Sequence, residues 1–268
     1  MANARLTRLK WFPLSVCLFL SMPALAADRI VALNPMISEW AAEILGKEVA
    51  LKRIVGSSEF SNYPEYLKTV PTVGPYPNIQ VEKVLSLNPD LVIGSVEYNR
   101  PDQIEKLRKL KLNVIMLPKE ELSQMKGWIL KLGDLLGEKR KAEMVSEEWN
   151  RKMAVLRSAR KSKSVFFQVQ FQPLITVGSE SFLHTVFQRI GYRNIFAHLT
   201  HAYPKVSKEA VLERNPDEVF VFEMETDSGD RHKTIETWKK SRVRFLNGDD
   251  FARCSPRLLS AVERMMEK

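Results

Sequence analysis

Carboxylates are the side chains of this sequence that could carry out acid–base chemistry. Glu39 and Glu43 form one close pair, and Asp249 and Asp250 form another. Two carboxylates in different surroundings can serve as general acid and general base. However, Glu39 and Glu43 lie four residues apart near the start of a predicted helix, where solvated charge is the ordinary explanation. The sequence also has no G-x-G-x-x-G loop after a strand, no G-K-[ST] loop and no G-x-S-x-G elbow. We therefore expect a protein that is not an enzyme.

Histidine and cysteine give little support for a metal centre. The four histidines all fall in the second half of the chain and form no His-rich loop: His184, His198, His201 and His232. Cys254 is the only cysteine after residue 26, so no intramolecular disulfide can form. We expect no metal site in the protein, and stability that comes from packing.

A nine-residue pattern, E-x-V-L-x-x-N-P-D, occurs at residues 82–90 and again at 209–217. Each copy predicts a short helix, with Asn78 or Ser207 as its N-cap and with Glu82 or Glu209 in its first turn, where a carboxylate complements the helix dipole. The proline ends the helix, and an apolar strand follows. Two copies on either side of a long helix predict two similar lobes with a cleft between them.

The elements that must position these residues alternate between strand and helix. Apolar β-rich runs occur at 29–33, 53–57, 91–95, 113–117, 165–169, 175–177, 218–222 and 243–246. Segments with helical spacing lie between these runs. Two of them end at a glycine, Gly46 and Gly191, and another has Pro101 in its first turn. This alternation predicts an α/β fold of two Rossmann-like lobes, each a mainly parallel sheet flanked by helices.

Residues 122–161 instead form a long, charged, largely helical stretch. We interpret its later part as one backbone helix joining the lobes, with an apolar stripe of Met144, Trp149, Met153 and Leu156; a surface helix of a single domain is the alternative. The predicted boundaries are an N-terminal lobe at 27–121, a connecting region at 122–162 and a C-terminal lobe at 163–268.

The first 26 residues have the pattern of a secretory signal peptide. A basic start is followed by an apolar run at 11–22 and by Ala24-Leu25-Ala26 as a cleavage signal. A lipoprotein signal ending at Cys17 is less favoured, because the apolar run continues past it. Cleavage removes three of the 41 basic residues and none of the 32 acidic ones, so the formal charge falls from +9 to +6. No basic block interleaved with aromatics indicates a nucleic-acid partner.

Several runs of this chain resemble the helical-backbone class of periplasmic binding proteins, which serve importers of cobalamin, haem and iron–siderophore complexes. The resemblance is strongest to the cobalamin-binding members of that class. It covers nearly the whole chain after the signal, at residues 30–35, 57–64, 81–93, 165–180, 194–196, 203–212 and 250–257. It implies two α/β lobes joined by one long helix, with a ligand bound in the cleft and only small closure.

The resemblance also implies residue roles. Glu82 and Glu209 are expected to dock on arginines of a membrane-embedded permease dimer, whose ATPase subunits are separate chains. The expected ligand contacts are Phe60, Tyr76, Ile175, Tyr203, Asp249, Asp250, Phe251, Ala252 and Arg253. The protein is expected to act as a monomer in the periplasm and to meet the membrane only through the permease.

The chain departs from the cobalamin-binding pattern at four positions. Ser95, Tyr76 and Tyr203 stand where tryptophans are expected, and Ile175 stands where an aromatic residue is usual. A corrinoid such as cobalamin is the first candidate ligand, with haem or an iron–siderophore as the alternative. A free metal ion is less favoured, because related metal-binding proteins take histidines from both lobes. An exported adhesion or scaffolding protein with no small ligand is a further alternative. It is less favoured, because the run 249–257 is hard to explain without a ligand in the cleft.

Overall fold

The structure is a computed structural model that describes residues 27–119, 121–156, 162–224 and 231–266. The predicted signal peptide, including Cys17, lies outside these residues. Among the helices that the structure describes, none has the length and apolar character needed to span a membrane.

The first lobe is built on a four-stranded parallel sheet in the order β2-β1-β3-β4. Its strands are β1 (Ile30–Ala32), β2 (Ile54–Ser57), β3 (Leu91–Ser95) and β4 (Val114–Leu117). The connecting helices are α1 (Pro35–Leu45), α2 (Lys47–Arg53), the 3-10 helix η1 (Glu65–Thr69), α3 (Val81–Ser86) and α4 (Pro101–Lys109). Every residue of β3 is buried, which accounts for its continuous apolar run, because helices cover both faces of a parallel sheet.

The second lobe repeats this plan with the order β6-β5-β7-β8, again fully parallel. Its strands are β5 (Lys163–Gln168), β6 (Tyr192–Asn194), β7 (Glu218–Glu223) and β8 (Arg242–Asn247). Its helices are α7 (Phe182–Arg189), α8 (Lys208–Arg214), α9 (Arg231–Thr237), α10 (Gly248–Phe251) and α11 (Pro256–Met266). The predicted α/β fold with two parallel sheets is thus confirmed.

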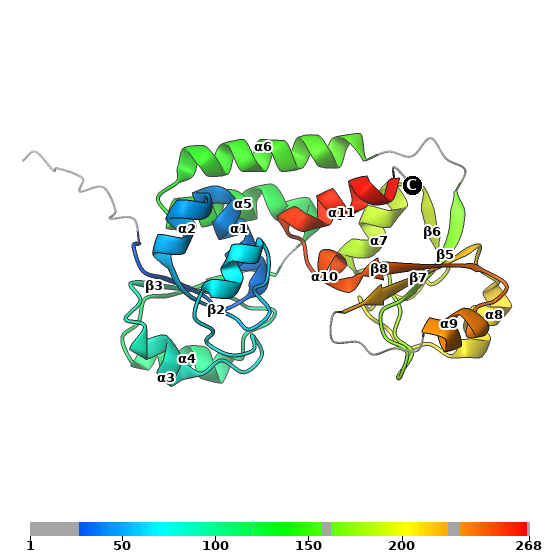
Figure 1. Ribbon diagram of the computed structural model, residues 1–268, viewed down its shortest axis with the longest axis horizontal. Coiled ribbons are helices and arrows are strands. Elements are labelled where there is room, and N and C mark those ends of the chain that lie inside the picture. Colours follow the sequence, from blue (N-terminus) through cyan, green and yellow to red (C-terminus); the bar gives the residue numbers. More distant parts are fainter. Residues whose placement is uncertain (1–26, 120, 157–161, 225–230, 267–268) are drawn as a thin grey trace, which may run out of the picture.

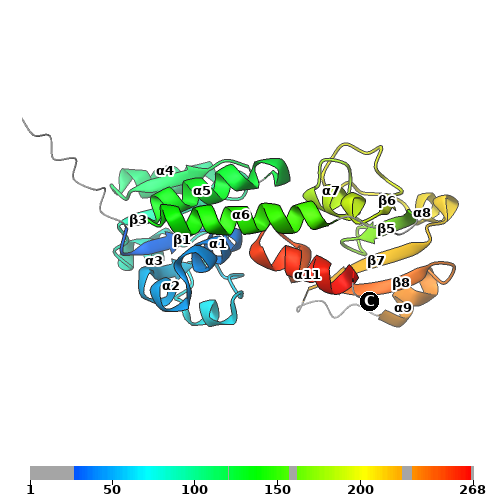
Figure 2. The same cartoon turned by 90° about the horizontal axis from the view of Figure 1, so that it is seen from above.

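The two lobes are joined by η2 (Leu122–Gln124), α5 (Met125–Leu135) and α6 (Lys139–Val155). Figure 1 shows α6 running along one side of the molecule from the first lobe toward the second, and the view from above in Figure 2 places it beside α1 and α11. Helix α1 packs on α5, α6 and α11, so the last helix of the chain returns to the first lobe. The single long connecting helix predicted from the charged stretch is confirmed as α6.

Helix boundaries follow local chemistry. The Asn34 side chain accepts a hydrogen bond from the backbone N–H of Met36 at 2.8 Å and begins α1, with Pro35 as its first residue. Gly46 ends α1 with φ 76°, a backbone conformation that glycine adopts without steric cost. The Ser207 hydroxyl likewise accepts from Ala210 N–H at 3.1 Å, which confirms it as the cap of α8.

Some expectations about elements were wrong. Asn78 does not cap α3, which begins after Gln80; its side chain instead accepts a hydrogen bond from Gln103. Residues 175–177 form no strand, because Ile175 makes only isolated antiparallel bridges. The short strand β6 was missed. Met144 does not belong to the apolar stripe of α6: its side chain is exposed, whereas Trp149, Met153 and Leu156 are buried.

Candidate functional site

The predicted ligand contacts follow the carboxyl ends of strands in both lobes. Phe60 comes after β2, Ile175 after β5 and Asp249 after β8. In each sheet the chain leaves its first strand toward one neighbour and later returns to pair on the other side, so the strand order reverses at β1 and at β5. Open parallel sheets bind ligands at the carboxyl ends of strands near such a reversal. The topology therefore gathers the predicted contacts at the edge where this fold class binds ligands.

Three aromatic rings of the first lobe pack edge to face beside one another. The centroids of Phe60 and Tyr76 lie 5.9 Å apart, and those of Tyr76 and Tyr98 lie 5.7 Å apart. Phe60 keeps 44% of its surface exposed, and the Tyr76 backbone is fixed by Asn99, whose amide donates to the Tyr76 carbonyl at 2.8 Å. The three rings thus form an aromatic surface whose members support one another. Tyr98 was not among the predicted contacts, although its position after β3 is a signal that could have found it.

In the second lobe, Ile175 and Tyr203 belong to two connected loops. Ile175 forms bridges to Gln170 and Lys205, and the backbone N–H of Thr176 donates to the Pro204 carbonyl at 3.0 Å. Ile175 is half-buried, and Tyr203 is 44% exposed. The short backbone bonds hold these two side chains on neighbouring segments.

Four charged side chains, Glu39, Asp249, Arg253 and Arg257, form an ion cluster that links α1 to the segment around α10 and α11. Glu39 is fully buried and accepts from Arg257 Nε at 3.1 Å on each carboxylate oxygen and from Arg253 Nη1 at 3.0 Å. Arg257 Nη2 also donates to Glu39. Arg253 further donates to Asp249 at 3.4 Å and to the Phe60 carbonyl at 3.3 Å. Two positive and two negative charges cancel within this cluster.

Two further side chains close the joint between the lobes. Asn62 donates to Asp249 at 3.4 Å and accepts from Arg257 Nη2 at 2.8 Å. The indole N–H of Trp40 donates to the Cys254 carbonyl at 2.8 Å. The loop that carries Phe60 is therefore fastened to the second lobe at the Phe60 carbonyl and at the Asn62 side chain.

The interpretation of Glu39 as solvated surface charge was wrong. Glu43, four residues later, is exposed, but Glu39 has no exposed surface. The sequence did hold a signal: α1 is apolar on nearly every side, and such a helix is buried all round. A buried carboxylate requires charged or hydrogen-bonding partners, which Arg253 and Arg257 supply. Because both carboxylate oxygens of Glu39 are engaged, they are occupied by structural contacts.

The side chains of Asp250 and Phe251 have neighbours outside the ion cluster. Asp250 pairs with Arg264 of α11 at 2.8 Å. The Phe251 ring packs on Phe187 and Phe222 with centroid separations of 5.8 and 5.5 Å, and it is almost fully buried. Both residues line a hollow of about 390 Å³ between β8 and α11. A ligand contact by either residue stays a prediction.

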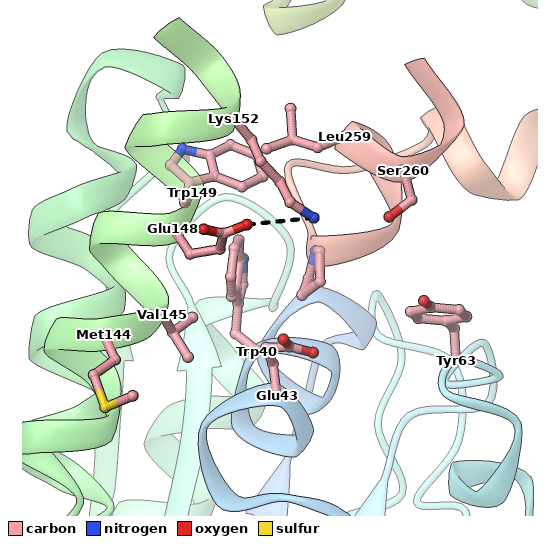
Figure 3. Close-up of a pocket in the computed structure, with 11 residues that line it drawn as sticks. Trp40, Glu43, Tyr63, Met144, Val145, Glu148, Trp149, Lys152, Leu259 and Ser260 are labelled. Carbon is pink, nitrogen blue, oxygen red and sulfur yellow. Dashed lines mark ion pairs between the residues drawn. The ribbon is translucent and has the colours of Figure 1, made fainter. Parts of the chain in front are cut away.

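A separate hollow of about 350 Å³ lies where α1, α6 and α11 meet (Figure 3). Trp40 and Glu43 line it from α1, Glu148 and Lys152 from α6, and Leu259 from α11. None of the predicted ligand contacts lines this hollow. The Glu148–Lys152 ion pair at 3.8 Å lies on the α6 side of this hollow.

The described residues contain no group of three or more His, Cys, Asp or Glu side chains placed to hold a metal ion. His184 is half-buried beside Asn194, and its burial lowers the pKa of the imidazole. His198, His201 and His232 are exposed.

The predicted docking residues lie on equivalent helices. Glu82 is in α3 and Glu209 in α8, and both side chains are exposed. In Figure 1 these helices lie toward the side of each lobe that faces away from α6.

The chain is similar to known proteins along nearly its whole length. It is 28% identical over 260 residues to the vitamin B12-binding protein of Salmonella choleraesuis, covering 93% of this chain and 94% of that one. Among solved structures, the periplasmic vitamin B12 binding protein BtuF of Vibrio cholerae is 27% identical with a TM-score of 0.74, covering 90% of this chain and 96% of that one. A periplasmic heme binding protein from Pseudomonas aeruginosa shares the fold at 24% identity and a TM-score of 0.76, covering 90% and 91%.

The family model described as periplasmic binding protein matches residues 30–242. The matched region begins at β1 and ends at the first residue of β8, so it includes strands of both sheets and the helices that join them. This chain therefore belongs to the periplasmic binding protein family.

Proposed function

We propose that the protein captures a corrinoid, with cobalamin as the first candidate, between its lobes and delivers it unchanged to the permease dimer of an ABC importer. The observation that carries this proposal is the similarity to vitamin B12-binding proteins, which extends over both lobes. In this proposal a cleaved signal peptide exports the chain to the periplasm, where it acts as a monomer. The ATPase subunits are separate chains.

The aromatic face of the first lobe supports a flat macrocyclic ligand. Phe60 and Tyr76 are held in place by their neighbours, so little side-chain freedom is lost when a ring stacks on them. Each aromatic contact adds roughly 0.5 to 1.5 kcal/mol beyond the buried area. Tyr203 and Ile175 provide the opposing contacts in this proposal, and the tyrosine hydroxyls donate to amides on the ligand edge.

The test of the ligand is a titration of the purified mature protein with cobalamin, cobinamide, haem and a ferric siderophore. We expect saturable binding of cobalamin or cobinamide, followed by tryptophan fluorescence or calorimetry. Tyr76→Ala and Tyr203→Ala should each weaken binding, whereas Met144→Ala on the exposed side of α6 should not. Preference for haem or the ferric chelate would reject the corrinoid and keep the transport role, with Tyr76 or Tyr203 as candidate iron ligands.

We further propose that Glu82 and Glu209 dock on the permease. Neither carboxylate has a hydrogen bond or an ion pair within the part of the chain that the structure describes, so both are available to a partner. One exposed ion pair contributes only about 0 to 1 kcal/mol, but two pairs meeting a two-fold symmetric partner fix the orientation. Replacing both glutamates by alanine should weaken permease binding, and unchanged affinity would reject this role.

A further inference from the structure

The two copies of E-x-V-L-x-x-N-P-D share six residues, and four of these have an evident structural role in both lobes. Val84 and Val211 have no exposed surface and pack in the cores under α3 and α8. Asn88 and Asn215 adopt left-handed backbone angles, with φ of 44° and 43°, a conformation that asparagine tolerates better than most residues. The prolines that follow are buried in both copies and cannot continue the helix.

The aspartate that closes each copy fastens the first strand of its own sheet. Asp90 accepts from the backbone N–H groups of Asp28 at 2.8 Å and Arg29 at 3.1 Å, immediately before β1. Asp217 accepts from the backbone N–H and the hydroxyl of Ser164 in β5, both at 2.7 Å. These bonds explain why both lobes carry an aspartate here.

The remaining two shared residues, glutamate and leucine, neither fill the core nor fasten a strand in either lobe. Leu85 is 41% exposed and Leu212 is 46% exposed, although the valine before each is fully buried. Each leucine lies three residues after the glutamate, so the two side chains share one face of their helix. A single exposed leucine needs no explanation. The same exposed pair at the same repeat position in two lobes is harder to attribute to chance.

We propose that Glu82 with Leu85, and Glu209 with Leu212, form two equivalent docking patches for one two-fold symmetric partner. The identity of that partner as the permease dimer rests on the proposed function. Each half of the dimer would present a cation beside an apolar hollow, so that the glutamate sets orientation and the leucine supplies the buried contact. Because an exposed ion pair contributes little, the leucines carry the larger share of the affinity.

The test uses the mature protein and the cognate permease–ATPase complex in nanodiscs, with affinity measured by biolayer interferometry. Leu85→Ala and Leu212→Ala are compared singly and together with wild type. Leu51→Ala in α2 and Val155→Ala in α6 are the controls, because these side chains are 39% and 63% exposed and belong to other helices. Cobalamin titration and thermal melts of every variant monitor ligand binding and folding.

We expect each leucine variant to bind the complex roughly tenfold more weakly, as loss of a buried leucine contact implies, and the double variant to bind more weakly still. The controls, the melts and cobalamin binding should not change. Wild-type affinity in the double variant would overturn this inference, while loss of binding in the Glu82→Ala, Glu209→Ala double variant would leave the proposed docking role standing. An effect from only one leucine would also overturn it, because the two patches would then not be equivalent.

Discussion

Replacing Glu39 by glutamine is expected to lower the free energy of unfolding by about 3 kcal/mol, and replacing it by alanine by up to about 5 kcal/mol. Glu39 is fully buried, and the side chains of Arg253 and Arg257 are only 10% and 5% exposed. The cluster with Asp249 is neutral, so losing one carboxylate leaves a net charge of +1 away from water. Removing one partner of a buried ion pair has a large cost because the other charge stays buried. Glutamine keeps one acceptor oxygen and therefore marks the lower value.

The same change should loosen the joint between the lobes. Glu39 bonds to residues 214 and 218 positions later in the chain, and Trp40 beside it packs on Trp149 with ring centroids 5.2 Å apart. Urea denaturation is therefore followed by tryptophan fluorescence in a background where Trp128 and Trp238 are replaced by phenylalanine, so that the signal comes from Trp40 and Trp149 at this junction, and by far-ultraviolet circular dichroism, which senses both lobes. We expect the two transitions to coincide in wild type and to separate in Glu39→Gln.

Glu43→Gln is the matched control, because Glu43 lies one turn later in the same helix, is exposed, and makes no hydrogen bond or ion pair with any described residue. Its stability should stay within about 0.5 kcal/mol of wild type. A second comparison replaces all four cluster members, Glu39, Asp249, Arg253 and Arg257, together by leucine or methionine, which should restore most of the lost stability because no uncompensated charge remains. A loss below about 1 kcal/mol in Glu39→Gln would refute the reasoning.

Three further predictions concern the elements around the sites. Hydrogen bonds from the Ser164 side chain and backbone lower the pKa of Asp217, so its carboxylate stabilises the fold above the unfolded-state pKa and this contribution is lost as pH falls through the lower folded-state pKa. Urea melts should show Asp217→Asn less stable than wild type at neutral pH and equal to it in strong acid. At Asn215, with φ 43°, glycine should be tolerated within a few tenths of a kcal/mol, whereas valine should lower the unfolding free energy by roughly 1 to 2 kcal/mol. In α5, a Cβ on Gly133 would lie 2.1 Å from the Ala142 Cβ, whereas one on Gly127 meets nothing within 4 Å; thermal melts should show Gly133→Ala destabilised by about 1 to 3 kcal/mol and Gly127→Ala neutral or slightly stabilised.

Much of the fold could be predicted because buried parallel strands leave continuous apolar runs. Strands β3 and β7 were located within a residue or two by this signal alone. Strand β6 escaped because it has three residues, one of them Arg193, and no periodicity. The run at 175–177 looked like a strand for the opposite reason: Ile175 and Val177 are apolar, but the backbone N–H groups of Ile175 and Thr176 donate to the Gln170 and Pro204 carbonyls and not to a strand of the sheet.

The candidate site was less accessible to sequence reasoning. The aromatic contacts came from resemblance, and the geometry adds that Phe60 and Tyr76 touch each other. The ion cluster could not be derived, because the bonds of Glu39 join it to residues more than two hundred positions later. Spacing within one segment says nothing about which distant carboxylate an arginine will meet. Only the apolar surroundings of Glu39 in the sequence could have shown that it needed buried partners, and our interpretation of it as solvated charge overlooked them.

The ion cluster also bears on which ligand the proposed site prefers. Arg253 is the one cation among the predicted contacts, and it already donates hydrogen bonds to Glu39, Asp249 and the Phe60 carbonyl. A guanidinium whose charge is balanced by two carboxylates attracts an anion weakly, because any gain is offset by repulsion from those carboxylates. A macrocycle edged with carboxylates would find little net positive charge at this position, whereas an edge of neutral amides would bind without separating charge. The electrostatics of the joint thus favour an amide-edged corrinoid over haem, which is the order of affinities that the titration will decide.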